Sequence, residues 1–297
     1  MEKQVLDDYI KAGRIAAQAR DEGAAKVVAG ARLIDVAEWI EGRISALGGG
    51  MAFPVNISIN NVAAHYTPDR EDASVFAEND VVKLDIGVHV NGYIGDTACT
   101  ISLAKDGRYD SLLKASREAL EDAVKIAVPG TRLGEIGEAV ENRIHSYGFK
   151  PVANLTGHGL EQYNLHAEPQ VPSIKNGSGY VLEDDQVIAI EPFASTGDGF
   201  VKESGEVLIY MLLQPQPVRM PEARQIINYG MKTNGLPFAK RWLAMSDIKF
   251  RLAMRELRSR NAVHEYPVLR DADGCRISQF EHTVIVGEKP MITTLPV

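Results

Sequence analysis

The sequence predicts an α/β fold of the mixed α+β type, built from two related halves about a pseudo-twofold axis. The first observation is an internal repeat: residues 30–48 and 130–148 agree without a gap at eight positions, including both bounding glycines. The second is the pair Asn91-Gly92 inside an apolar stretch at 81–103, the strongest short-range signal for a β-hairpin turn. The third is the alternation of helical and strand-like patterns along the chain. A single recurrence at this distance indicates two homologous halves rather than a solenoid of short repeats.

Length and composition bound the class of protein. At 297 residues, 45% hydrophobic and 24% charged, the chain can bury a sizeable core as one large domain or two ordinary ones. A net charge of −8 argues against nucleic acid as the main partner. Cys99 and Cys275 lie far apart and are typical of unpaired thiols in a reducing compartment. No signal peptide or 18-residue apolar run is present, so we expect a cytoplasmic protein without a membrane span.

The first half begins with helical patterns. Residues 2–28 carry apolar side chains at helical spacing, and a second amphipathic segment runs from Leu33 to Leu47 and stops at three consecutive glycines. The repeat predicts the equivalent helix within 130–148. No long exposed apolar stripe requires a partner subunit, and we therefore expect a monomer.

The hairpin brings two carboxylates together. A two-residue turn pairs Val90 with Tyr93 and, counting outward, Asp85 with Ala98. Asp96 then lies diagonally across from Asp85 on the same face, with Cβ atoms roughly 7–8 Å apart. An exposed hairpin with one solvated face is the simpler interpretation of such a pair. Burial would require cations, because two buried carboxylates side by side are very costly without them.

The second half supplies matching acids. Residues 78–87 align with 183–192 after one inserted residue, and this alignment places Asp85 over Glu191 at the end of an apolar strand. The symmetry predicts a fourth carboxylate on the strand that partners Glu191, and the candidate is Glu281 in the strand-like run 276–286. Four inward carboxylates from two halves would form a cradle for two metal ions.

Three of the seven histidines are placed to join this cluster. His158 lies between two glycines on an expected loop, and a neutral imidazole complements carboxylates at one metal of a pair. His166 follows eight residues later, and His65 lies 101 positions before His166, so the half-motifs correspond again. The other four histidines are not expected at the site. His89 and His145 are expected on the surface, and the position of His264 is uninformative. His282 is expected on the strand face opposite that of Glu281.

A long segment at 214–270 separates the two glutamates. Its pattern predicts at least two helices, one beginning near Pro237 and one near Ser246. Residues 221–270 hold ten Lys or Arg against four Asp or Glu. Basic side chains at i, i+4 and i+7 form a stripe on the second helix; they are Arg251, Arg255 and Arg258. The stripe is read either as a solvated helix face or as a contact with a polyanion such as RNA.

Five sequence blocks between Phe53 and Val286 resemble the signature blocks of type II methionine aminopeptidases, in the wider M24 group. The blocks are FPVNISINNVAAHYTP, KLDIGVHVNGYIGDTA, GHGLEQYNLHAE, AIEPFASTG and QFEHTVIV. The helical segment before QFEHT is typical of type II, and the absence of an N-terminal extension is similar to the short archaeal form. Thr156 departs from the family pattern, and we expect no effect on the site.

This resemblance implies a pita-bread (creatinase/aminopeptidase) fold, with one catalytic domain over 1–297 and the insertion at 214–270 within it. It implies removal of the N-terminal methionine from nascent proteins, preferentially before a small second residue, by a hydroxide activated at two divalent ions. The ions that the resemblance implies are Co, Mn, Fe or Zn.

The resemblance also assigns residues. The implied metal ligands are Asp85, Asp96, His158, Glu191 and Glu281. Asp96 and Glu281 would bridge both ions, Asp85 would bind one of them, and His158 with Glu191 would bind the other. Glu191 would accept the proton, His166 would stabilise the oxyanion, and His65 would hold the scissile peptide. The implied methionine pocket comprises Phe53, His65, His166 and Tyr266.

Three alternative functions share these features in part. A prolidase or aminopeptidase P would use the same five ligands, but we expect it to carry an additional N-terminal domain. A non-catalytic scaffold of the same fold would have lost ligands. The third is RNA or ribosome binding through the basic insertion, which could accompany catalysis near the ribosomal exit.

Overall fold

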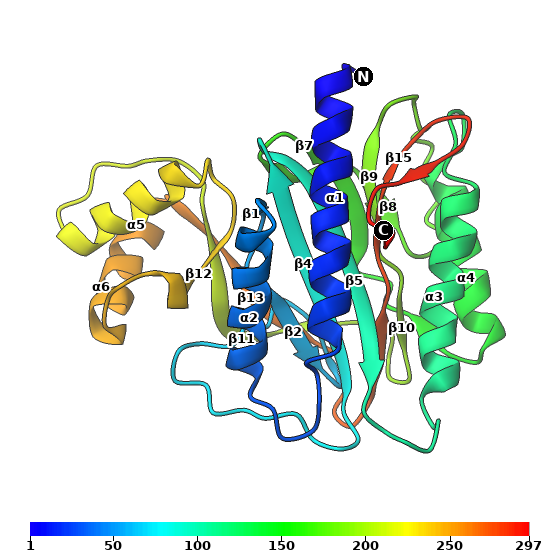
Figure 1. Ribbon diagram of the computed structural model, residues 1–297, viewed down its shortest axis with the longest axis horizontal. Helices are drawn as coiled ribbons and strands as arrows, with labels where there is room; N and C mark the ends of the chain where they lie inside the picture. Colours follow the sequence, from blue (N-terminus) through cyan, green and yellow to red (C-terminus); the bar gives the residue numbers. More distant parts are fainter. Residues whose placement is uncertain (297) are drawn as a thin grey trace.

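The computed structural model describes residues 1–296. Four helices pack against antiparallel strands and leave the interior of the molecule to the strands (Figure 1). In the first half these are α1 (Lys3–Ala24) and α2 (Leu33–Ala46), and in the second half α3 (Asp110–Lys125) and α4 (Leu133–Ser146). No described helix is long and apolar enough to cross a bilayer. Both Cys99 and Cys275 carry free thiols.

The sequence repeat is also a repeat of structure. Helices α2 and α4 occupy positions 100 apart, and each is preceded and followed by a glycine with positive φ: 85° and 93° for Gly30 and Gly130, 84° and 80° for Gly48 and Gly148. Glycine adopts this left-handed conformation without steric penalty, so it can turn the chain into and out of both helices. The predicted pair of related halves is confirmed.

The hairpin is the centre of the first half. Strands β4 (Val81–Val90) and β5 (Tyr93–Ser102) pair in the predicted register, with Val90 opposite Tyr93 and Asp85 opposite Ala98. The short strands β1 (Gly50–Met51) and β2 (Asn56–Ile59) pair with the edge of β4 opposite β5, one near each end of β4. One face of β4 packs on α1 and α2, which leaves its opposite face, with Asp85, toward the second half.

The second half contains a five-stranded sheet in the order β16-β15-β9-β7-β8. Its strands are β7 (Thr156–Glu161), β8 (Asn164–Pro172), β9 (Val187–Ile190), β15 (His282–Ile285) and β16 (Met291–Ile292). A smaller sheet joins β6 (Lys150–Pro151), β10 (Phe193–Ser195) and β14 (Ile277–Gln279).

Two local predictions about this half are wrong. The run 276–286 is not one strand, because β14 pairs with β10 whereas β15 pairs with β9, and the chain changes sheets at Phe280–Glu281. His158 lies within strand β7 rather than on a loop. Its neighbouring glycines are required by close strand packing: a Cβ on Gly157 or Gly159 would lie 2.2 Å from a backbone oxygen of an adjacent strand.

The segment before Glu281 forms a separate lobe, at the left of Figure 1. It contains α5 (Pro221–Lys232), β12 (Phe238–Ala239), the 3₁₀ turn η1 (Lys240–Trp242) and α6 (Asp247–Arg258). The strands β11 (Lys202–Leu212), β13 (Val263–Arg270) and β3 (Val62–Ala64) connect it to the rest of the chain. The expected helix start near Pro237 is wrong: Pro221 occupies the first helical turn, and Pro237 precedes the short strand β12. The start at Ser246 is confirmed.

Candidate metal centre

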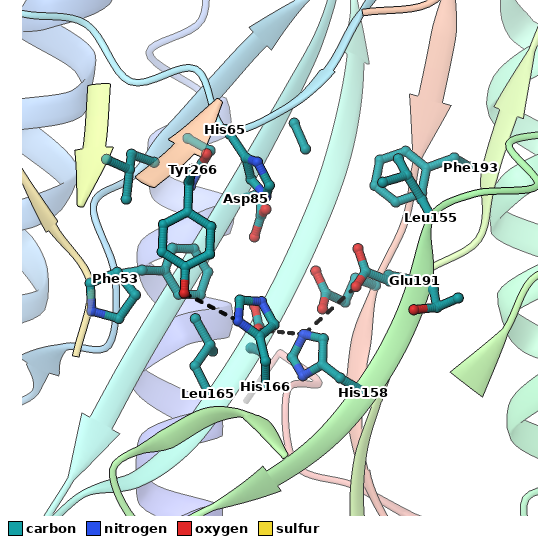
Figure 2. A pocket seen from close by; sticks show the side chains of 17 residues that line it. Phe53, His65, Asp85, Leu155, His158, Leu165, His166, Glu191, Phe193 and Tyr266 are labelled. Carbon is teal, nitrogen blue, oxygen red and sulfur yellow. Dashed lines mark hydrogen bonds and ion pairs between the residues drawn. The ribbon is translucent and has the colours of Figure 1, made fainter. Parts of the chain in front are cut away.

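Four acids and one histidine converge on a single cavity between the two halves (Figure 2). Asp85 and Asp96 come from the facing strands of the hairpin, where Asp96 is opposite Gly87. Glu191 follows directly after β9, and Glu281 lies at the chain's change of sheet between β14 and β15. His158 enters from β7, beside β9. The residues singled out from the sequence are therefore neighbours in space.

The imidazole of His158 lies close to two of the carboxylates. Nε2 of His158 lies 3.8 Å from Oδ2 of Asp96 and 3.7 Å from Oε1 of Glu191. Ligand atoms of Asp96, His158 and Glu281 all lie within 4.8 Å of one another. Side-chain atoms at this spacing can bind a common cation.

The electrostatics of the cluster are unfavourable for the protein alone. Burial and the neighbouring negative charges raise the pKa values of Asp96 and Glu281 well above the ordinary value, and burial raises that of Asp85 to about 7. One carboxylate oxygen each of Asp85 and Asp96 is buried without a hydrogen-bond partner. Burial also lowers the pKa of His158 to about 4, so its imidazole is neutral. Unpartnered carboxylate oxygens beside a neutral imidazole fit divalent cations.

Threonine hydroxyl groups hold the backbone of Asp96 and of Glu281 in place. The side chain of Thr283 accepts a hydrogen bond from the amide of Asp96 at 2.7 Å and donates one to its carbonyl oxygen at 2.9 Å. The hydroxyl of Thr97 donates to the carbonyl oxygen of Glu281 at 2.9 Å. These contacts join β5 to β15 across the two halves. They were not predicted from the sequence, because isolated threonines in strands carry no distinguishing signal.

Two more histidines and a tyrosine line the same cavity. His65 has a positive φ of 67°, a strained conformation for this residue, and its Nδ1 lies 3.0 Å from the carbonyl oxygen of Pro267. If Nδ1 donates to that oxygen, Nε2 is left free toward the cavity. Nδ1 of His166 lies 3.5 Å from the hydroxyl of Tyr266 (Figure 2). Burial lowers the pKa values of both histidines, so both are neutral.

Phe53 and Tyr266 also line the cavity, which has a volume of about 120 Å³. Sequence reasoning missed several apolar and small polar wall residues; they are Asn56, Ala64, Leu155, Leu165, Phe193, Ile209 and Pro237. Phe193 lies two residues beyond Glu191 and could have been found by strand periodicity, whereas Leu165 is adjacent to His166, so the same periodicity assigns it to the opposite face. Ile209 could not have been found in this way, because it enters from β11, distant in the sequence.

The model of metallopeptidase family M24 matches residues 7–288. The chain belongs to metallopeptidase family M24. Two proteins named methionine aminopeptidase are similar to this M24 chain over nearly its full length. The one from Thermococcus onnurineus is 48% identical, covering 96% of this chain and 98% of the relative. The one from Pyrococcus horikoshii is 46% identical, covering 97% and 98%.

Solved M24-type structures agree with the fold. The methionine aminopeptidase of Thermotoga maritima superposes with a TM-score of 0.74 at 25% identity, covering 99% of this chain and 98% of that one. The prolidase of Pyrococcus furiosus gives 0.64 at 17% identity, covering 100% and 65%, and this likeness shows the fold alone. The resemblance and the pita-bread fold predicted from the sequence are confirmed.

Proposed function

We propose that this M24 chain is a methionine aminopeptidase that removes the N-terminal methionine from nascent chains in the cytoplasm, preferentially when the second residue is small. The observation that carries the proposal is the convergence of Asp85, Asp96, His158, Glu191 and Glu281 in one buried cavity, in a chain 48% identical to a protein of that name.

Five residues would hold two divalent ions. The central Asp96 and Glu281 would contact both, Asp85 would bind one, and His158 with Glu191 would bind the other. Manganese, iron, cobalt and zinc all suit a carboxylate-rich site with one imidazole. Such ions supply an acidified water and polarise a carbonyl group when bound.

The protein's own groups complete the reaction. Glu191, whose pKa burial and Asp85 raise, accepts the proton lost by the water. His166 hydrogen-bonds the carbonyl oxygen on which negative charge develops, and His65 holds the scissile peptide through its free nitrogen. Phe53 and Tyr266, with both histidines, form the walls that accept an unbranched thioether.

Within this proposal residues 1–297 form one catalytic domain, of which residue 297 lies outside the described range. Residues 214–270 are an inserted subdomain, whose α5, α6, β12 and β13 form an apolar core together with the preceding strand β11. We propose a monomer as the working unit.

Hydrolysis of Met-Ala-Ser, compared with Ala-Ala-Ser and Met-Pro, tests the function. Chelated protein refilled with Mn²⁺ or Co²⁺ is expected to release methionine from Met-Ala-Ser alone, and chelator without refilling is expected to abolish release. Cleavage of Met-Pro without cleavage of the tripeptide would identify a prolidase instead. Folded protein that is inactive with every metal would favour the non-catalytic scaffold.

We further propose that α6 contacts the ribosome, where nascent substrates appear. Arg251 and Arg255 are exposed and make no ion pair with a described residue, whereas Arg258 of the predicted stripe pairs with Glu265 at 2.6 Å. Only the first two cations of the stripe are thus available to bind a polyanion.

Reversing both charges tests this contact. Arg251→Glu with Arg255→Glu is expected to weaken co-sedimentation with ribosomes by about tenfold or more at low salt, because phosphate contacts depend on released counterions. Lys11→Glu with Lys114→Glu makes the same charge change on α1 and α3 and is the matched control. Equal co-sedimentation of both double variants would exclude α6 as the contact.

A further inference from the structure

Lys83 is a fully buried lysine with no opposite charge beside it. Its side chain is 0% exposed, and no carboxylate of a described residue lies within 4.0 Å of its ammonium group. It lies in β4 two residues before Asp85, and the alternation of strand side chains places both on the same face. Burying an unpaired ammonium is costly, so its contacts require an explanation.

The ammonium is held by two backbone carbonyl oxygens from other parts of the chain. Nζ donates to the carbonyl oxygen of Asn60 and to that of Ile277, each at 3.1 Å. The amide of Ile277 also donates to the carbonyl oxygen of Asn60 at 3.1 Å. Lys83 therefore joins β4 to the β2–β3 turn and to β14, three segments that meet at this point.

Each of the three segments continues into a residue of the candidate site. Strand β4 carries Asp85, the β2–β3 turn leads through β3 to His65, and β14 leads to Glu281, four residues beyond Ile277. The two acids belong to different halves of the molecule. The distance between the two acids therefore depends on how the two halves pack together. Lys83 holds one contact between the halves, because it binds carbonyl oxygens from both of them.

We propose that Lys83 is a positioning residue for the metal centre: its ammonium group sets the distance between Asp85 and Glu281 by binding the carbonyl oxygens of Asn60 and Ile277. The inference rests on the proposed metal site. It assigns to Lys83 no contact with substrate and no proton transfer.

Two variants separate the hydrogen bonds from the charge. Lys83→Met keeps the length and loses every donor, whereas Lys83→Gln is uncharged but keeps N–H donors. We expect equilibrium dialysis of chelated Lys83→Met protein to show Mn²⁺ binding about 10–100-fold weaker than in the wild type, the range typical of groups that orient metal ligands. We expect kcat for Met-Ala-Ser to fall in parallel while KM stays within about threefold. Lys83→Gln is expected to recover part of the Mn²⁺ affinity.

Val82→Ala is the matched control, since Val82 is equally buried in β4 but faces the helices. It is expected to lower the melting temperature without weakening Mn²⁺ binding. Methylammonium, which can occupy the space left in Lys83→Ala, is expected to restore binding, and the bulkier tetramethylammonium is not. Lys83→Met with wild-type Mn²⁺ affinity, or Val82→Ala with the same loss as Lys83→Met, would overturn the inference. Wild-type protein that binds none of Mn²⁺, Fe²⁺, Co²⁺ and Zn²⁺ would overturn the proposed function, and with it the premise of this inference.

Discussion

Replacing Asp96 with asparagine is expected to abolish metal-dependent hydrolysis and, at the same time, to raise the melting temperature of the metal-free protein. Asp96 is 3% exposed, and one of its carboxylate oxygens is buried without a hydrogen-bond partner. Burial and the charges of Asp85 and Glu191 raise its pKa. The carboxylate thus opposes folding when no cation is present, and it is central to the cluster when one is bound.

The two effects have different sizes. Loss of a central ligand is expected to lower kcat/KM at least about a thousandfold, equivalent to roughly 4 kcal/mol of transition-state stabilisation. Removal of one buried charge is expected to stabilise the chelated protein near pH 7.5 by about 0.5–2 kcal/mol, the usual size of a single stabilising substitution. Thermal unfolding of chelated protein measures the change in stability, metal analysis measures the loss of bound ions, and the tripeptide assay measures kcat/KM.

Asp271→Asn is the matched control. Asp271 is also buried, and although burial opposes its ionisation, hydrogen bonds from Ser195 and from backbone amides hold its pKa below the ordinary value. The same substitution is therefore expected to destabilise the protein at this second position and to leave hydrolysis in place. Metal-free Asp96→Asn that is less stable than the wild type would contradict a cation-binding role for this cluster.

The parts of the fold that were predictable are those with local signals. Asn91-Gly92 fixes the turn, and the period of two along each strand then determines that Asp85 and Asp96 share a face. The repeat likewise brings matching glycines to the ends of α2 and α4. These conclusions needed only neighbouring residues or a comparison of the chain with itself.

The features that the sequence did not predict depend on contacts between segments that are distant in the sequence. An unbroken run of strand-forming residues cannot show that β14 and β15 pair with different strands, although that break is what places Glu281 beside the hairpin, where its amide donates to Ala98. Glycines around His158 indicate a loop by composition, but here they permit close packing of β7 on its neighbours. The helical stripe on α6 does not reveal that Glu265 of β13 pairs with Arg258.

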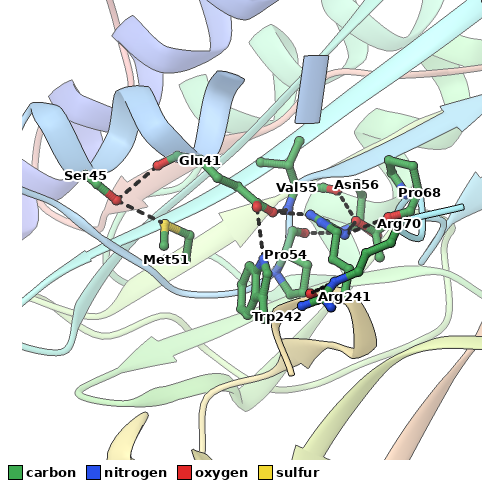
Figure 3. A network of polar contacts seen from close by, with 11 residues as sticks. Glu41, Ser45, Met51, Pro54, Val55, Asn56, Pro68, Arg70, Arg241 and Trp242 are labelled. Atoms are coloured by element: carbon green, nitrogen blue, oxygen red, sulfur yellow. Dashed lines mark hydrogen bonds and ion pairs between the residues drawn. The ribbon is translucent and has the colours of Figure 1, made fainter. Parts of the chain in front are cut away.

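The contact that attaches the insertion to the first half also could not be predicted from the sequence. Glu41 and Glu141 are equivalent in the repeat, yet only Glu41 meets an arginine of the insertion, Arg241 (Figure 3). Oε2 of Glu41 also accepts a hydrogen bond from Trp242 at 2.9 Å, and Nη1 of Arg241 donates to Thr67 at 2.5 Å. Only one half carries the insertion, so the symmetry of the sequence could not predict this pair.

Arg241→Met is therefore expected to lower the free energy of unfolding by about 3–5 kcal/mol, because it leaves the carboxylate of Glu41 buried without its cation. The pair is not itself a large source of stability. Burial raises the pKa of Glu41 and lowers that of Arg241, so desolvation outweighs mutual attraction for both groups. The double variant Glu41→Leu with Arg241→Met is expected to recover at least half of the loss, since it removes both buried charges together.

Urea unfolding of the two single variants and the double variant gives the coupling energy directly. Arg43→Met is the control, because the Arg43–Glu22 pair is about one-third exposed on each side and is expected to contribute about 0–1 kcal/mol. Glu41 also accepts a hydrogen bond from the amide of Val55, two residues beyond Phe53 in the cavity wall. If the pair anchors that wall, Arg241→Met should also raise KM for Met-Ala-Ser, whereas Arg43→Met should not. Additive losses in the double variant would show that the two side chains stabilise the fold independently.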